Sequence, residues 1–298
     1  MSSSSPPVPS HYAVDDAGYP PRLLGLPRPP QTVTVLGSLG AGTRVAIVGT
    51  RRPIPAAAAF AHDLAAAVVS RGGVVVSGGA VGIDAMAHEG ALSNGGRSWV
   101  VAPTGHGEVF PVEHGELFER VVAHGGAVIW PFPPGTPVHR ARFLQRNGVL
   151  VALADVLVIV QARIPSGALN AASWARKLGR PRWVVCPAPW LLGPEFAGCH
   201  LERALGARAL TSVDFFLDAI GVPKQLGLPM PPATPSPPRN PVETAVLAAL
   251  EGAPKHADQV VVQCGLRYPE VMTALLTLAL DDVLVEGPEG SFRLAYPP

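Results

Sequence analysis

Long apolar segments and cysteine pairs are both missing from this sequence. No uncharged apolar run reaches the roughly 18 residues that a membrane-spanning helix needs, and the opening MSSSSPPVPS lacks the basic and apolar regions of a secretory signal. We therefore expect a cytoplasmic protein with no membrane partner. The three cysteines, Cys186, Cys199 and Cys264, form no C-x-x-C pair, so we expect packed, unreactive thiols and neither a disulfide framework nor a metal site.

Lysine is also scarce, and a strong overall charge is absent. Three lysines accompany twenty arginines, and the net charge is +1, which argues against a uniformly basic nucleic-acid binder. The charge is unevenly distributed, because residues 41–222 carry 16 basic against 12 acidic residues and residues 223–298 carry 5 against 8. Within 121–194, Asp155 is the single acid among eight basic residues. This stretch is therefore predicted to produce a locally positive field.

The usual nucleotide-binding loops are absent as well. A dinucleotide fold needs G-x-G-x-x-G directly after its first strand, but the turn VGTRRP contains Gly49 alone. The next Gly-rich turn has Gly78, Gly79 and Gly82 at a different spacing, and no lysine follows a glycine as a P-loop requires. We therefore expect no nucleotide cofactor.

Short β-branched runs alternate with Ala-rich helical segments from Arg44 onward. This βαβ pattern predicts an α/β fold, an extended Rossmann-like and mostly parallel sheet with helices on both faces. The expected strands lie within 44–50, 74–79, 98–105, 127–132, the second half of 142–162 and 182–187. The expected helices lie within 55–72, 83–96, 116–126, the first half of 142–162, 166–179 and 211–221.

The composition divides the chain into four parts. Residues 1–40 are predicted to be a Ser/Pro-rich lead-in, with order beginning near Tyr19, and residues 41–222 the Rossmann-like domain. The Pro-rich segment 223–240 is predicted to be a linker. Residues 241–298 then form the last domain.

This last domain is predicted to be a small winged-helix-like domain, with three short helices followed by two strands around a Gly-Pro-Glu-Gly turn. Its third helix carries Glu270, Asp281 and Asp282 and no basic residue, so it is a poor candidate for DNA recognition. A protein-docking role is the alternative.

Two turns are predicted to bind a phosphate. The stretch VVVSGGAVGIDAMAH and the turn after residue 48 both follow parallel strands, so they should meet at the carboxyl edge of the sheet. There Thr50, Arg51 and the free N–H groups at Ser77 could bind one phosphate from two sides. The alternative is that Gly78 and Gly79 only permit tight strand-to-helix packing.

Asp84 and His88 lie four residues apart on the following predicted helix. They could form an acid–base pair. The simpler interpretation makes Asp84 a turn brace or helix-dipole partner and His88 a half-buried structural histidine.

The segment HRARFLQRN, residues 139–147, combines cations with an aromatic ring. It carries Arg140, Arg142, Arg146 and Asn147 around Phe143 and contains no acid. Guanidinium groups bind phosphates bidentately and an aromatic ring stacks on an unpaired base, which together suit a single strand. A solvated helix face, with Phe143 in the core, is the alternative.

With these segments, the chain resembles the DprA/Smf family of DNA-processing proteins over most of residues 19–220. Gly49-Thr50-Arg51 corresponds to the family's Gly-Ser-Arg turn, and SGGAVGIDAMAH corresponds to its GID-x-x-AH signature. The segments VAPTGHGEVFP, FPPGTP, RFLQRN and SGALNAA follow in the family's order. The resemblance implies a homodimer that binds single-stranded DNA without cutting it, needs no cofactor, and delivers the strand to the RecA recombinase during natural transformation.

The chain also departs from the family pattern. Gly148 and Pro165 stand where arginine is common, and Ala168 and Ala171 stand where hydroxyl residues are common. We expect these changes to remove cations and hydroxyls from the DNA groove. The residues predicted to bind DNA, from the patterns and the resemblance together, are Gly49, Thr50, Arg51, Ser77, Gly78, Gly79, Gly82, Arg142, Phe143, Arg146, Asn147, Ser166 and Gly167.

One alternative function remains, a nucleotide-binding or nucleoside-monophosphate-hydrolysing protein of related architecture. Phosphoribohydrolases of similar fold carry a P-G-G-x-G-T turn and a nearby catalytic glutamate. This chain lacks that turn, and residues 121–154 contain no acid. The binding function is therefore favoured, and no catalytic residue is assigned.

Overall fold

The computed structural model describes residues 8–185, 193–222, 240–250, 253–280, 283–286 and 291–294. The chain folds into two compact units, Met1–Leu226 and Gly227–Pro298. Most of the segment 223–240, which the sequence predicts to be a linker, lies outside the described residues. The four-part division at residues 40, 222 and 240 stays a prediction.

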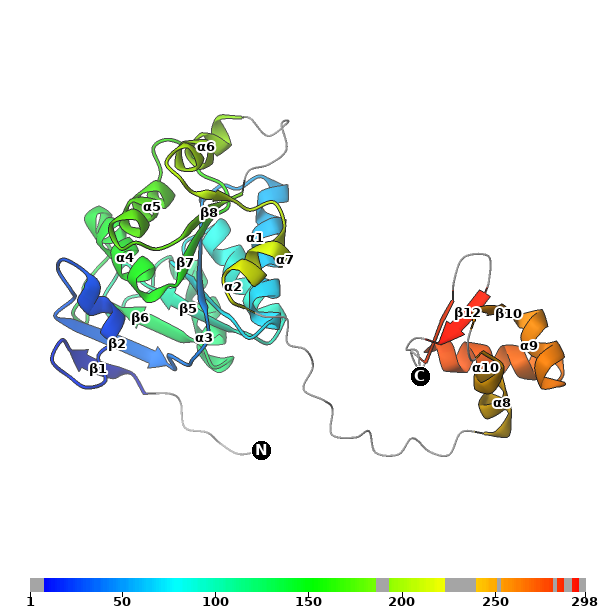
Figure 1. Ribbon diagram of the computed structural model, residues 1–298. Helices are drawn as coiled ribbons and strands as arrows, with labels where there is room; N and C mark the ends of the chain where they lie inside the picture. The colour runs from blue at the N-terminus through cyan, green and yellow to red at the C-terminus, as the bar shows by residue number, and fades with distance from the viewer. Residues whose placement is uncertain are drawn as a thin grey trace. The chain divides into compact units, whose positions relative to one another are not determined.

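A nine-stranded sheet forms the centre of the first unit (Figure 1), in the order β1-β2-β6-β5-β4-β3-β7-β8-β9. The seven strands from β6 to β9 in this order run parallel, whereas β1 and β2 pair antiparallel at one edge. The strands are β1 (Ser10–Ala13), β2 (Thr32–Gly37), β3 (Arg44–Val48), β4 (Val74–Ser77), β5 (Arg97–Val101), β6 (Ala127–Trp130), β7 (Val156–Ile159), β8 (Arg182–Val184) and β9 (Arg208–Ala209).

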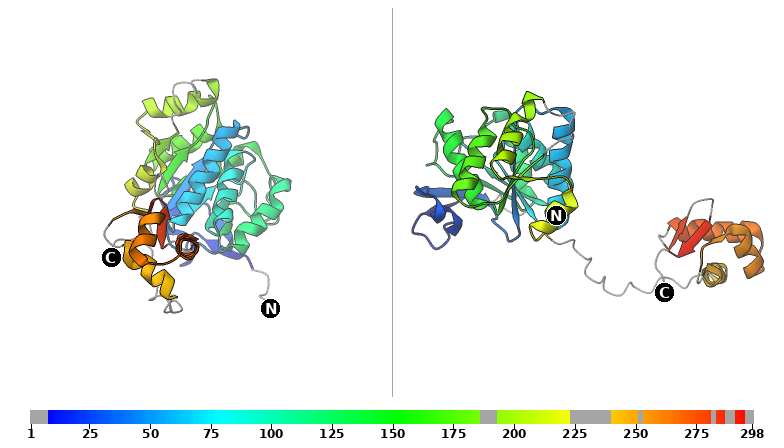
Figure 2. Two further views of the ribbon diagram at one scale, coloured as in Figure 1. Left: turned by 90° about the vertical axis from the view of Figure 1, so that its right-hand side faces the viewer. Right: turned by 45° about the horizontal axis from the view of Figure 1, so that its top comes forward.

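Helices cover both faces of this sheet. Helices α1 (Pro55–Ser70), α2 (Ile83–Ser93) and α3 (Gly115–Ala123) pack in sequence on one face, and α4 (Arg140–Leu153) and α5 (Gly167–Lys177) pack together on the other (Figures 1 and 2). Helix α6 (Ala197–Ala204) contacts α5, and α7 (Val213–Ala219) contacts α1. The described residues of the unit also contain the 3-10 turns η1 (Pro21–Gly25), η2 (Val112–His114) and η4 (Pro194–Phe196).

The predicted Rossmann-like fold is therefore confirmed, and its cause is visible in the strands. Strands β4, β6 and β7 are buried along their whole length, because helices shield them on both sides. Such strands consist of continuous apolar runs, which is the pattern that the sequence shows.

The structure corrects the expected start of order near Tyr19. Strand β1 already pairs with β2 upstream, with Tyr12 opposite Val33. Most of β1 is exposed at the sheet edge, so its short sequence SHYA lacks the apolar alternation of a half-buried strand. Helix α6 and strand β9 were not predicted either.

The chain reverses its direction of travel across the sheet between β3 and β7. It runs β3, β4, β5 and β6 toward one edge, returns through α4, and places β7 on the other side of β3. The crevice at the carboxyl ends of such a pair of strands is where open α/β sheets bind ligands. The first predicted phosphate-binding turn, residues 49–51, follows β3 at this point.

The second unit contains α8 (Pro241–Leu250), β10 (Lys255–His256), α9 (Ala257–Cys264), α10 (Tyr268–Leu280), β11 (Leu284–Glu286) and β12 (Ser291–Leu294). The strands form a sheet in the order β10-β12-β11, and the unit has its own apolar core. The predicted winged-helix-like fold is thus confirmed. Asp281, Asp282 and the predicted Gly-Pro-Glu-Gly turn lie outside the described residues.

Two remaining expectations concern membranes and thiols. Within the described ranges, no helix is both long and apolar enough to span a bilayer. Cys199 is completely buried, as expected for a packed thiol, and Cys264 is half-buried. Cys186 lies outside the described residues.

Candidate functional site

Hydrogen bonds with Gln161 and Ile83 hold the turn after β3 in place. The Thr50 N–H donates to the Gln161 carbonyl oxygen at 2.8 Å, and the Ile54 N–H donates to the Gln161 side-chain oxygen at 3.0 Å. The Ile83 N–H, at the start of α2, donates to the Thr50 carbonyl oxygen at 3.1 Å. Gln161 is buried and was not predicted as a site residue. Its position as a polar residue at the end of the apolar run VLVIVQA is the sequence feature that could have identified it.

Arg146 on α4 is a buried cation. Its side chain is almost fully enclosed, and Nη1 donates to the Val101 carbonyl oxygen at 3.0 Å. Among the described residues, Arg146 Nε has no hydrogen-bond partner and the Arg146 guanidinium forms no ion pair. Burial lowers the pKa of Arg146 to about 10, against the opposing effect of Asp84. An anion in contact with this group would restore the interactions lost by its desolvation.

The second predicted turn, which contains Gly78, packs against the Arg146 guanidinium. A Cβ atom built on Gly78 would lie 1.5 Å from Arg146 Nη1, so only glycine leaves room for the guanidinium. The Gly78 N–H donates to Asp84 Oδ2 at 3.2 Å, which confirms Asp84 as a turn brace. Burial raises the pKa of Asp84, and the Arg146 charge opposes that rise.

The structure changes the role expected for the Ser77–Gly79 turn. The Ser77 side chain is fully buried, and its Oγ donates to the Ile47 carbonyl oxygen at 2.6 Å. Gly79 has φ +70°, and a Cβ there would lie 2.7 Å from Phe118. Neither Ser77, Gly78 nor Gly79 lines the neighbouring pocket at the carboxyl ends of β3 and β7, because Arg146 and Phe118 cover this turn.

Substituting Gly78 by alanine is expected to lower the free energy of unfolding by about 1–3 kcal/mol, because the added methyl overpacks the buried Arg146 guanidinium. Chemical denaturation monitored by circular dichroism measures this. Gly25→Ala is the matched control, since a Cβ at Gly25 meets no atom within 4 Å. Equal stability of the two variants would contradict the proposed packing.

Three elements converge on a pocket of about 280 Å³ at the carboxyl ends of β3 and β7, which we call the switch-point pocket. The turn after β3, helix α4 and the start of α5 each contribute predicted residues. These lining residues are Gly49, Thr50, Arg51, Phe143, Arg146, Asn147, Ser166 and Gly167. Asp84 is the one acid among the described residues that line it.

A second hollow of about 850 Å³, the arginine–aromatic groove, shares Arg51, Phe143, Ser166 and Gly167 with this pocket. The exposed Arg51 guanidinium lies 4.9 Å from the centre of the Phe143 ring, and Phe110 meets Phe143 edge-on at 5.4 Å. Phe110 adds an aromatic ring that the sequence analysis did not single out, and Arg140 adds a cation that it named in the segment 139–147 but left out of the predicted DNA-binding residues. The pocket and groove form one continuous, cation-bearing depression.

Two further predicted residues do not line this depression. Arg142 Nη1 donates to the Pro137 carbonyl oxygen, and its guanidinium lies 5.9 Å from the Phe132 ring. Gly82 has φ +86°, and a Cβ there would lie 2.5 Å from the Thr50 carbonyl oxygen, so it supports the first turn from behind.

The departures from the family pattern are only partly in the pocket. Pro165, Ala168 and Ala171 line it. Gly148 does not, since a Cβ there would lie 2.9 Å from the Trp174 ring. Gly148 therefore lies outside this pocket, and the expectation that it removes a cation from the groove stays a prediction.

His88 is fully buried rather than half-buried. Its Nδ1 lies 2.7 Å from Ser98 Oγ, and that hydroxyl donates to the Val75 carbonyl oxygen at 3.3 Å. We therefore assign the proton to Nδ1, which donates to Ser98 Oγ, and Nε2 has no hydrogen-bond partner among the described residues. Burial lowers the pKa of His88 to about 3. A neutral, enclosed imidazole suits a structural role.

Two family models match the chain. Residues 10–221 match the model described as DNA recombination-mediator protein A, and residues 230–290 match the DprA winged helix domain. A Mycobacterium tuberculosis protein described as DNA processing protein DprA is 36% identical over 251 residues, which cover 84% of this chain and 64% of that protein. Protein Smf of Escherichia coli is 30% identical over 298 residues, which cover 96% of this chain and 78% of that protein.

Two solved structures of DprA proteins are also similar to this chain. The X-ray structure of DprA from Streptococcus pneumoniae superposes with a TM-score of 0.64 at 27% identity, covering 70% of this chain and 73% of that one. A structure described as showing the unique single-stranded DNA binding mode of DNA processing protein A from Helicobacter pylori gives 0.63 at 26% identity, covering 70% and 95%.

Proposed function

Because this chain belongs to the DNA recombination-mediator protein A family, the DprA/Smf proteins, we propose that it binds single-stranded DNA in the switch-point pocket and the arginine–aromatic groove without cutting it. The observation that carries this proposal is Arg146, a buried guanidinium at the base of a depression open to solvent, which forms no ion pair with a described carboxylate although the buried Asp84 acts on its pKa. We propose a backbone phosphate of the strand as the anion that binds this cation.

The groove suits the rest of a single strand. Arg51 offers an exposed guanidinium for a neighbouring phosphate, and Phe143 and Phe110 offer ring surfaces for unpaired bases. Base–aromatic stacking contributes about 1–3 kcal/mol per base with little sequence preference. The site is therefore expected to bind strands of any sequence.

Further parts of the proposal concern the whole protein. The chain spans 64% of the length of the Mycobacterium relative, so its partners are proposed from family membership alone. They are a second copy of the chain, forming a homodimer, and the RecA recombinase, to which the strand is delivered during natural transformation. Action in the cytoplasm belongs to the same proposal.

Arg51→Ala and Phe143→Ala are each expected to weaken binding of a fluorescein-labelled oligo-dT about tenfold, since each removes one charge-assisted or stacking contact. Fluorescence anisotropy measures the affinity. Lys177→Ala removes one positive charge from α5 outside both hollows and is the matched control. Parental affinity in both test variants would exclude this pair from the site.

Salt dependence tests the phosphate contacts separately. The logarithm of the binding constant is expected to fall linearly with that of the salt concentration, by about 0.7 per phosphate contacted on a single strand. Arg51→Ala should reduce this slope by roughly one contact, whereas Phe143→Ala should leave it unchanged. Identical slopes in all three proteins would contradict a phosphate contact by Arg51.

The nucleotide alternative is tested by calorimetric titration with AMP. Asp84, the acid of the switch-point pocket, accepts a hydrogen bond from the Gly78 N–H and braces that turn. Micromolar binding of AMP, with release of the base on incubation, would favour hydrolysis over strand binding.

The second unit is proposed as a protein-docking accessory. In α10, Glu270 pairs with Arg267, so the cation at the start of this helix is already engaged by an acid. The unit also has a core separate from that of the first unit. Deleting residues 223–298 is therefore expected to leave the affinity for oligo-dT within about twofold of the parent, a change below 0.5 kcal/mol.

A further inference from the structure

Arginines begin four of the parallel strands in the first unit. Arg44 begins β3, Arg97 begins β5, Arg182 begins β8 and Arg208 begins β9. Parallel strands place their amino ends at one edge of the sheet, opposite the edge that carries the switch-point pocket. This amino edge therefore has a row of cations that the proposed strand site does not use.

A pocket of about 570 Å³ opens at this amino edge. Its walls contain four arginines, Arg176, Arg180, Arg182 and Arg208, and one acid, Asp155. Trp183, Ala219 and Ile220 add apolar surface. We call this hollow the amino-edge pocket.

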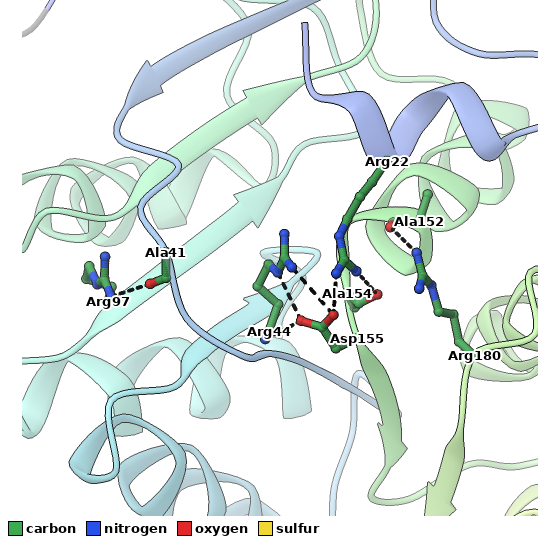
Figure 3. Close-up of polar contacts among 8 residues, drawn as sticks. All are labelled: Arg22, Ala41, Arg44, Arg97, Ala152, Ala154, Asp155 and Arg180. Atoms are coloured by element: carbon green, nitrogen blue, oxygen red, sulfur yellow. Dashed lines mark hydrogen bonds and ion pairs between the residues drawn. The ribbon is translucent and has the colours of Figure 1, made fainter. Parts of the chain in front are cut away.

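The two acids near these arginines are already engaged. Asp155 pairs with Arg22 at 2.5 Å and with Arg44 at 3.0 Å (Figure 3). Glu202, which is buried, pairs with both Arg176 and Arg182. Each carboxylate therefore serves two guanidinium groups, which leaves a surplus of positive charge.

Arg180 and Arg208 have no carboxylate partner among the described residues. Arg180 Nη2 donates to the Ala152 carbonyl oxygen at 3.1 Å (Figure 3), and its buried Nε finds no hydrogen-bond partner in the described part of the chain. The Arg208 guanidinium lies 5.6 Å from the centre of the Trp183 ring. The segments 1–7, 186–192 and 223–226 of this unit, which are not described, contain no Asp or Glu.

The surroundings of Arg180 confirm the surplus. Burial lowers the pKa of Arg180, and the charges of Arg22 and Arg44 lower it further, while Asp155 opposes them. Among the described residues, Asp155 is the acid that acts on Arg180, and Arg22 and Arg44 already share it. An anion in the pocket would offset this repulsion.

We infer that the amino-edge pocket binds phosphate groups, as a second anion site independent of the proposed strand site. Guanidinium forks from three elements suit a tetrahedral anion with several acceptor oxygens, and the apolar wall around Trp183 suits the organic part of a phosphate ester. The volume lies within the usual range of small-ligand pockets. The phosphate can come from a free nucleotide or from a nucleic-acid backbone.

The test combines Arg180→Ala with Arg208→Ala in the full chain. Calorimetric titration with ATP and with inorganic pyrophosphate measures free phosphates, and fluorescence anisotropy with oligo-dT measures the strand. The double variant is expected to lose about tenfold in affinity for the phosphate source that the pocket binds. The control, Lys177→Ala with Arg203→Ala, removes the same charge from α5 and α6 outside the pocket.

The two sources give different results. Weaker binding of ATP and pyrophosphate with unchanged binding of oligo-dT assigns the pocket to free phosphates, whereas weaker binding of oligo-dT assigns it to a nucleic-acid backbone. Loss in neither assay, or equal loss in the control, overturns the inference. Arg208→Ala alone, at an exposed position, repeats the test if the double variant has a lowered melting temperature. Because Arg51→Ala and Phe143→Ala test the other edge, failure of the strand site leaves this result interpretable.

Discussion

Replacing Arg146 by methionine is expected to lower the affinity for single-stranded DNA about hundredfold without lowering the free energy of unfolding. The loss of affinity is larger than for Arg51 because Arg146 is almost completely buried. A phosphate paired with it is shielded from water, where charge-assisted hydrogen bonds are stronger than at an exposed position.

The stability of this variant follows from the same burial. The folded protein lowers the pKa of Arg146 to about 10, which means that its surroundings disfavour the charged form. Methionine has a similar length and carries no charge, so it removes that cost while losing the hydrogen bond to the Val101 carbonyl oxygen. The substitution also removes the charge that opposes the raised pKa of the buried Asp84, so Asp84 is expected to take up a proton and become neutral. These effects oppose each other, and the free energy of unfolding is expected to change little.

Urea denaturation and oligo-dT anisotropy on the same preparation test this pair of outcomes. Lys177→Met serves as the control for the loss of one positive charge. Reduced stability together with retained DNA affinity would show that Arg146 is a structural residue and would remove the main support for the proposed site.

Acid is expected to destabilise the protein through His88. The pKa of His88 is about 3 in the folded state and 6.5 ordinarily, so between these values the unfolded chain binds a proton that the folded chain does not. The free energy of unfolding should therefore fall as the pH decreases below 6.5, by about 1.4 kcal/mol per pH unit from this group. Protonation would place an N–H and a charge at Nε2, where no acceptor is available among the described residues.

His88→Asn isolates this contribution, because its amide nitrogen can replace the Nδ1–H donor and does not titrate. Asp84, whose raised pKa acts with the opposite sign, and His114, whose charge also disfavours protonated His88, are present in both proteins. Urea denaturation at several pH values should give a shallower acid slope for the variant. Equal slopes would show that His88 does not set the acid sensitivity.

The parallel sheet was predictable because its strands are buried on both faces. The runs in β3, β4 and β7 are continuous and β-branched, and Gly-rich turns mark where they end. Strand β1 and helix α6 were missed for physical reasons. β1 is an exposed edge strand, and the buried polar residue of α6, Glu202, interrupts its apolar face while pairing with two arginines that are distant in sequence.

The site was predictable where the sheet geometry alone brings segments together. Arg51 after β3 and Arg146 on α4 meet at the switch point, as parallel strands with a reversal require. The direction in which a side chain points was not predictable. Arg142 and Arg146 are one helical turn apart, yet Arg142 lies over Phe132 and only Arg146 enters the pocket. The role of Gly78 was not predictable either, because it depends on the guanidinium packed against it.

The hydrogen bonds that Gln161 accepts from both ends of the Thr50–Ile54 segment should affect the rate at which a strand binds. A loop that is already anchored does not have to become ordered when a ligand arrives, so the encounter complex can mature without a slow rearrangement. Capture of a strand should then be limited by diffusion and electrostatic attraction, and the lifetime of the complex, rather than its rate of formation, would distinguish one variant from another.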